Sequence, residues 1–99
     1  MSEIMISERE VRKHMVLLPD WVYIDRKISR TYKFYNFIES MQFVNRVAQA
    51  AEAVNRHPDI YIRRNVVSLT LTAPDTEGVP LSDFRLAASL DDVADQINR

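Results

Sequence analysis

The hydrophobic period changes several times along this chain, and these changes strongly limit the folds open to it. In residues 66–72, VVSLTLT, apolar side chains alternate with hydroxyl side chains, as in a strand with one buried face. In residues 36–54 the apolar side chains recur every three or four positions, which is typical of an amphipathic helix. The whole pattern predicts helix, strand, strand, helix, strand, strand, helix, over residues 8–17, 21–24, 29–35, 36 to Pro58, 59–64, 66–72 and 81–98.

Local signals mark where two of these helices begin or end. Ser7 followed by Glu10 predicts a capping box, which would satisfy free backbone donors at the start of the first helix. Pro58 disfavours the α conformation in the residue before it, so we expect it to end the second helix.

The predicted element order favours an α+β fold. The economical arrangement is a four-stranded antiparallel sheet with three helices packed on one face, in the order α-β-β-α-β-β-α. A chain of 99 residues is expected to be a single domain over residues 1–99, and its core is modest in size.

The second predicted helix carries more apolar surface than one small sheet needs. A second stripe lies about 100° around the helix from the first. We therefore expect part of this helix to contact another subunit, in a homodimer or homotetramer, although a helix lodged deep in its own core is the alternative. The two stripes are residues 37, 41, 44, 48 and 51, and residues 43, 47, 50 and 54.

Composition excludes several kinds of site. The absence of cysteine removes disulfides, thiolate catalysis and cysteine-based metal sites, and with only two histidines, His14 and His57, no metal or other cofactor is expected. Gly78 is the single glycine, so the glycine-rich nucleotide loops are absent.

Charge and hydropathy indicate where such a chain acts. Thirteen basic and fourteen acidic residues give a net charge of -1, which argues against direct nucleic-acid binding. No apolar run approaches the roughly 18 to 20 residues that span a bilayer, and MSEIMISERE does not resemble a secretory signal. We expect a cytoplasmic protein without membrane contact.

Two long stretches resemble a known family. They are FVNRVAQAAEAVNRHPDIYI and VSLTLTAPDTEGVPLSDFRLAASLDD, and the upstream WVYIDRKISRTYKFYNF also fits. The sequence is similar, without gaps from about Phe43 to Ala94, to the pterin-4a-carbinolamine dehydratases. The resemblance covers nearly the whole chain and implies the same fold as the element order.

The resemblance also implies a chemistry. These enzymes remove water from a 4a-hydroxytetrahydropterin, so one group protonates the departing hydroxyl while another takes a proton from the ring nitrogen. Catalytic members resemble one another in a His-His-Pro motif after the second helix and a third histidine after the fourth strand. Here Arg56 stands at the first histidine, His57 at the second and Pro74 at the third. Arginine cannot act as a general base and proline carries no ionisable group.

Other residues match the surroundings of that site. Glu52 and Asp83 match its acidic positions, and we expect Glu52 to pair with Arg56 four residues on. The remaining candidates for a ligand pocket or a partner surface are Pro58, Asp59 and a basic rim of Arg56, Arg63 and Arg64, with Asp75 and Glu77 as weaker candidates for a carboxylate in the turn.

Three functions remain open at this point. The first is a non-catalytic or repurposed member that acts through its oligomer surface or remnant pocket, as dimerisation cofactors and Rubisco assembly chaperones of this family do. The second is a dehydratase of low activity, with His57 as its sole acid/base and Glu52 or water completing the reaction. The third is an enzyme acting on another heterocycle. The partners expected are a second copy of the chain, a protein with an acidic surface and a pterin-like small molecule.

Overall fold

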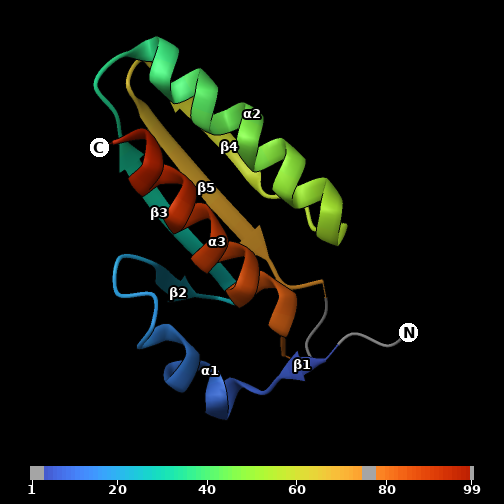
Figure 1. Ribbon diagram of the computed structural model, residues 1–99. Coiled ribbons are helices and arrows are strands. Elements are labelled where there is room, and N and C mark those ends of the chain that lie inside the picture. Colours follow the sequence, from blue (N-terminus) through green and yellow to red (C-terminus); the bar gives the residue numbers. More distant parts are fainter. Residues whose placement is uncertain (1–3, 75–77, 99) are drawn as a thin grey trace.

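A four-stranded antiparallel sheet in the order β2-β3-β5-β4 forms one layer, and the helices cover one of its faces (Figure 1). The structure is a computed structural model and describes residues 4–74 and 78–98. This arrangement confirms the predicted α+β fold. The elements of the two layers are β2 (Val22–Ile24), β3 (Lys27–Lys33), β4 (Asp59–Arg63), β5 (Val66–Thr72), α1 (Glu8–Met15), α2 (Phe37–Val54) and α3 (Leu81–Ile97).

The register of the central strands decides which side chains face the helices. β3 and β5 pair from Lys27 with Thr72 to Lys33 with Val66. Residues directly opposite each other in an antiparallel pair point to the same face. Alternate pairs therefore bury apolar side chains under α2 and α3, and the hydroxyl side chains between them point away. The largest fully buried apolar side chains include Phe43, Ile28, Leu69, Leu71, Leu90, Val47, Val67 and Val79.

Helix α1 starts as predicted but differs in detail. Ser7 is the N-cap residue, yet its side chain makes no capping hydrogen bond. The reason is that the Glu10 amide, which a capping box would use, donates to the Ser7 carbonyl at 2.8 Å. The helix ends at Met15 rather than Leu17, and the predicted capping box is wrong.

Helix α2 ends before it reaches Pro58. Asn36 caps its start, because the side chain accepts a hydrogen bond from the Glu39 amide at 2.9 Å. At the other end Asn55 adopts the left-handed conformation, with φ of 55°, and this terminates the helix after Val54. Pro58 lies beyond that turn, so the cause predicted for the helix end is wrong.

A second sheet of two short strands was not predicted. β1 (Met5–Ile6) pairs with β6 (Val79–Pro80), immediately before α3. Gly78 has a φ of 138°, and a Cβ atom there would lie 2.3 Å from the Ile6 carbonyl oxygen. Only glycine fits this backbone approach, which joins the start of α1 to the start of α3.

A polar network ties the sheet to α3. Trp21 Nε1, Arg30 Nη1 and the Tyr32 hydroxyl all donate to Oδ1 of Asp91, at 2.9, 2.6 and 2.6 Å. The Arg30 guanidinium also lies 4.2 Å from the centre of the Tyr32 ring. Burial, and then the hydrogen bond to Asp91, raise the pKa of the Tyr32 phenol.

Within the described ranges, no helix combines the length and the apolar character that crossing a membrane requires.

Candidate functional site

The end of α2, the end of β5 and the first turn of α3 bring several of the predicted residues together. The left-handed turn at Asn55 swings Arg56 off the axis of α2 and toward α3. Asp83 lies in the first turn of α3 and has no exposed side-chain surface. These elements therefore place Arg56 against Asp83, although 27 residues separate them in the sequence.

Arg56 and Asp83 form a bidentate ion pair. Arg56 Nε donates to Asp83 Oδ1 at 2.6 Å, and Nη2 donates to Oδ2 at 2.9 Å. The same Nη2 donates to the carbonyl oxygen of Thr72 at the end of β5, also at 2.9 Å. Such two-point contacts fix the plane of a guanidinium, so the cation is held rigidly in place. Asn55 and Thr72 were not predicted, but an asparagine directly after a helical run is a known signal for a left-handed cap.

Glu52 does not form the pair expected of it. The Glu52 carboxylate contacts His57 instead, with 2.5 Å between Oε2 and Nε2. Because α2 ends at Val54, Arg56 is no longer one helical turn beyond Glu52, and the chain brings His57 to that place. Both partners are exposed, with 55% of the His57 side chain and 78% of the Glu52 side chain accessible.

The remaining predicted residues of the site differ in how far they are exposed. Pro58 is half-buried, and Asp59 is exposed at the start of β4. Pro74 is exposed at a bend that follows β5. Asp75 and Glu77 lie outside the described residues.

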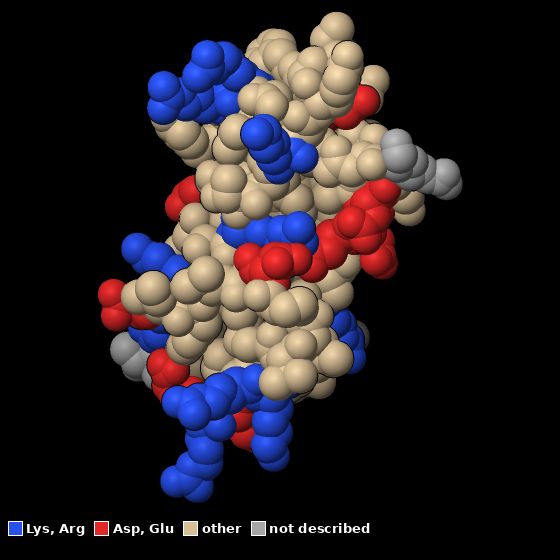
Figure 2. Space-filling model, turned by 90° about the vertical axis from the view of Figure 1, so that its left-hand side faces the viewer, with Lys and Arg blue, Asp and Glu red and all other residues tan. Residues whose placement is uncertain are grey.

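The predicted basic rim does not form. Arg63 is at the opposite end of β4 from Asp59, about 13 Å along the strand at the usual rise per residue. Arg64 lies in the β4–β5 turn with a φ of 54°, while Arg56 faces Asp83. Figure 2 shows, on one face of the molecule, several separate groups of basic residues, some of which adjoin acidic residues.

The site is chemically limited. The guanidinium of Arg56 stays protonated and cannot accept a proton, and Pro74 has no titratable group. An imidazole hydrogen-bonded to a carboxylate, the His57–Glu52 arrangement, can exchange protons. The described residues of this site therefore hold one imidazole, one fixed cation and the carboxylates of Glu52, Asp59 and Asp83.

Comparisons with known proteins show which family this sequence matches. Residues 5–93 match the family described as pterin 4 alpha carbinolamine dehydratase. A relative from Picosynechococcus sp. (strain PCC 7002) is 41% identical over 86 residues, covering 87% of this chain and 94% of its own. Another, from Chloroflexus aurantiacus, is 42% identical over 88 residues, covering 89% and 95%. Both carry the name "Putative pterin-4-alpha-carbinolamine dehydratase".

Solved structures share the fold. A transcriptional coactivator/pterin dehydratase from Brucella melitensis superimposes with a TM-score of 0.83 at 27% identity, over 92% of this chain and 99% of that one. A pterin dehydratase-like protein identified as a RuBisCO assembly factor in the alpha-carboxysome gives 0.63 at 23% identity, over 75% and 86%. At this lower identity the likeness concerns the fold alone.

The fold is that of a pterin dehydratase-like protein. The chain belongs to the pterin-4-alpha-carbinolamine dehydratase family, as its match over residues 5–93 and its relatives at 41% and 42% identity establish.

Proposed function

We propose that this chain is a family member without dehydratase activity that acts as an oligomeric scaffold through its surface. The observation that carries the proposal is the bidentate pair of Arg56 with the fully buried Asp83. Arg56 stands at a position where the catalytic members of the family resemble one another in having a histidine. It is held there as a permanent cation.

The dehydration needs two groups that exchange protons near neutral pH. Arg56 and Pro74 supply neither, which leaves His57 to serve both steps. Loss of a general acid or base typically reduces a rate by about 10² to 10⁴. Two such losses are enough to bring catalysis close to the spontaneous reaction.

Exposed apolar side chains favour a role through the surface. On α2, 55% of Phe37 and 66% of Ile38 are accessible, and Tyr35 just before the helix is 85% accessible. Such a cluster is typical of a contact between subunits or with a partner. The assembly-factor relative uses the same fold, which makes a scaffold role consistent with the architecture.

A partner with an acidic surface would contact a smaller basic surface than the predicted rim of three arginines. Arg63 and Arg64 at the β4–β5 turn are both exposed and are the basic pair left for it. A pterin-like ligand would instead lie beside His57, with Pro58 and Asp59 next to it in sequence.

The proposal is tested by restoring the missing histidines. The double variant Arg56→His with Pro74→His is expected to dehydrate 4a-hydroxytetrahydropterin measurably in stopped-flow absorbance, because His57 and Glu52 remain in place to complete the site. Each single variant is the matched control and is expected to stay near the spontaneous rate. A double variant that folds but neither turns over nor binds a pterin analogue in calorimetry would contradict the account of a decayed catalytic site.

A dehydratase of low activity is the second candidate, and the 2.5 Å contact between His57 and Glu52 favours it. In that case the native protein has a slow rate that His57→Ala abolishes and Glu52→Gln lowers. Native and His57→Ala proteins that match the spontaneous reaction would exclude this candidate.

A further inference from the structure

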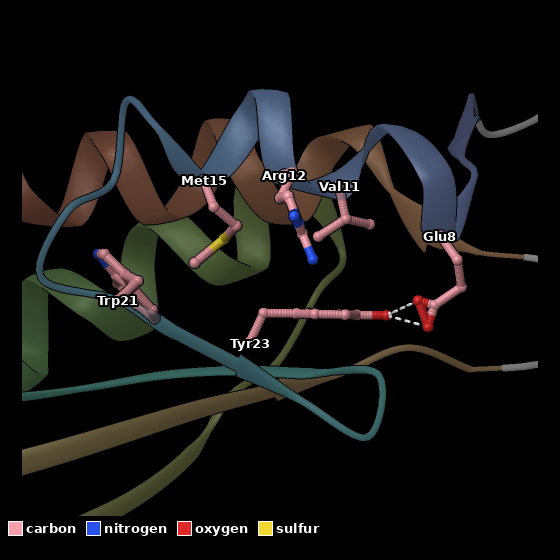
Figure 3. A pocket seen from close by; sticks show the side chains of 6 residues that line it. All are labelled: Glu8, Val11, Arg12, Met15, Trp21 and Tyr23. Atoms are coloured by element: carbon pink, nitrogen blue, oxygen red, sulfur yellow. Dashed lines mark hydrogen bonds between the residues drawn. The ribbon is translucent and has the colours of Figure 1, made fainter.

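A surface cavity of about 460 Å³ is lined by residues of α1 and by Trp21 and Tyr23 at the start of β2 (Figure 3). These two elements lie away from the end of α2 (Figure 1). Small-molecule sites commonly have volumes of about 300 to 1,000 Å³. The lining side chains are Glu8, Val11, Arg12, Met15, Trp21 and Tyr23. The cavity therefore has room for a small ligand and shares no lining residue with the site described above.

One end of the cavity is apolar. Val11 and Trp21 belong to the hydrophobic core, and the partly buried Met15 packs against it. In Figure 3 the Met15 and Trp21 side chains lie near one end, and the Tyr23 ring extends along the side opposite the helix. This end suits an aliphatic or aromatic group removed from water.

Glu8 lies at the other end of the cavity, and Arg12 lies between Glu8 and Met15 (Figure 3). Among the residues that the structure describes, no ion pair joins these two opposite charges. Glu8 and Arg12 are four residues apart on α1, a spacing that usually favours an ion pair. The Tyr23 hydroxyl instead donates to both oxygens of Glu8, at 2.7 and 2.5 Å. A tyrosine phenol is protonated at neutral pH and so acts as the donor here. Burial, and then this hydrogen bond, raise the pKa of the Tyr23 phenol further, to about 12.

Arg12 is the charged group oriented for a ligand. Its guanidinium points into the cavity in Figure 3 and forms no ion pair with any residue in the part of the chain that the structure describes. A guanidinium presents paired donors that match a carboxylate. Each Glu8 oxygen keeps acceptor capacity beyond its bond to Tyr23, which an ammonium group can use.

We propose that this cavity binds an α-amino acid with an apolar side chain. Its carboxylate lies on Arg12, its ammonium on Glu8, and its side chain against Met15 and Trp21. Glu8, Arg12 and Met15 follow one another along one face of α1 at axial steps of about 6 and 4.5 Å. The three groups of an α-amino acid branch from a single carbon atom, so one small ligand can contact all three side chains. A ligand with only one charge would make only one of these two charge-assisted contacts.

The single tryptophan of the chain, Trp21, lines the cavity and reports on binding directly. Titration of the full-length protein with L-leucine, followed by Trp21 fluorescence and by calorimetry, is expected to give a saturable change. The analogues 4-methylpentanoate, which lacks the ammonium, and 3-methylbutylamine, which lacks the carboxylate, are each expected to bind about tenfold or more weakly, as the loss of a charge-assisted contact requires.

Variants separate the two charged contacts. Arg12→Gln and Glu8→Gln are each expected to weaken L-leucine binding by about tenfold or more. Arg9→Gln removes an equal charge from an exposed position of the same helix outside the cavity and is expected to keep the native affinity. No saturable signal, or equal binding by all three variants or by either analogue, would overturn the proposal. None of these results bears on dehydration, so the two proposals fail independently.

Discussion

At the scale of single residues, the pair of Arg56 and Asp83 is the feature on which the site depends. A carboxylate with no exposed surface is expensive to keep charged unless a cation and hydrogen bonds compensate it. Arg56 supplies two of those hydrogen bonds, and the start of α3 adds a favourable helix dipole. The pair therefore holds the end of α2 to α3 while removing Arg56 from proton transfer.

Arg56→Ala is expected to lower the free energy of unfolding by about 2 to 3 kcal/mol, because it takes two charge-assisted hydrogen bonds from a buried carboxylate. Denaturant unfolding followed by Trp21 fluorescence measures this. The matched control is Arg63→Ala on the exposed end of β4, for which we expect a change within about 0.5 kcal/mol. Equal midpoints for the two variants would show that the pair contributes nothing to stability.

At the scale of elements, the Tyr23 hydroxyl joins α1 to β2 through Glu8, and this contact is sensitive to high pH. The pKa of Tyr23 is about 12 in the folded protein, against an ordinary value of 10. The unfolded chain therefore loses this proton first, so the contribution is complete below pH 10 and is lost as the pH rises from 10 to about 12.

Tyr23→Phe removes that titration. Between pH 10 and 12 the free energy of unfolding of the native protein is expected to fall more steeply than that of Tyr23→Phe, as urea unfolding at several pH values would measure. Parallel curves for the two proteins across this window would contradict the assignment.

Long periodic elements could be predicted from the sequence and short or tertiary ones could not. β5 occupies the predicted residues 66–72 because its alternation is unbroken, and α3 ends one residue from the prediction. The two-residue strands β1 and β6 are too short to show any period. Their only sequence signal is Gly78, whose positive φ becomes meaningful once Ile6 is known to lie beside it.

Some features of the candidate site could also be predicted from the sequence and others could not. Its chain positions follow from the motif around His57, so the regions after α2, after β5 and at the start of α3 were predictable. The partners were not, because the expected pairing of Glu52 with Arg56 assumed that the helix continues. Its actual end at Val54 exchanges the partners, giving Glu52 to His57 and Arg56 to Asp83. A contact across 27 residues depends on how α3 packs, which local patterns do not contain.

At the scale of the whole molecule, α2 presents apolar surface that the chain itself does not cover. Ser40, Phe43, Val47 and Ala51 face the core, while other apolar residues of the helix, including Ile38, remain accessible. We therefore expect a dimer or tetramer in solution. Light scattering at micromolar concentration is expected to give a multiple of 11.6 kDa, and a mass near 11.6 kDa itself would contradict this.

The interface can be located by charge substitution. Ile38→Glu is expected to shift the protein toward monomer, because Ile38 is 66% exposed on α2 and a buried unpaired carboxylate is costly. Val16→Glu is the matched control, since Val16 is 74% exposed at the end of α1, far from α2 (Figure 1). If Val16→Glu dissociates the oligomer and Ile38→Glu does not, the interface lies on α1.

The most direct test of the account is the rate at which the native protein dehydrates 4a-hydroxytetrahydropterin. Stopped-flow absorbance compares it with the spontaneous reaction and with a three-histidine relative of the same family. With Arg56 fixed to Asp83 and Pro74 unable to titrate, we expect a rate close to the spontaneous one. Turnover comparable to that of the three-histidine relative would contradict the proposal that this member acts as a scaffold rather than as an enzyme.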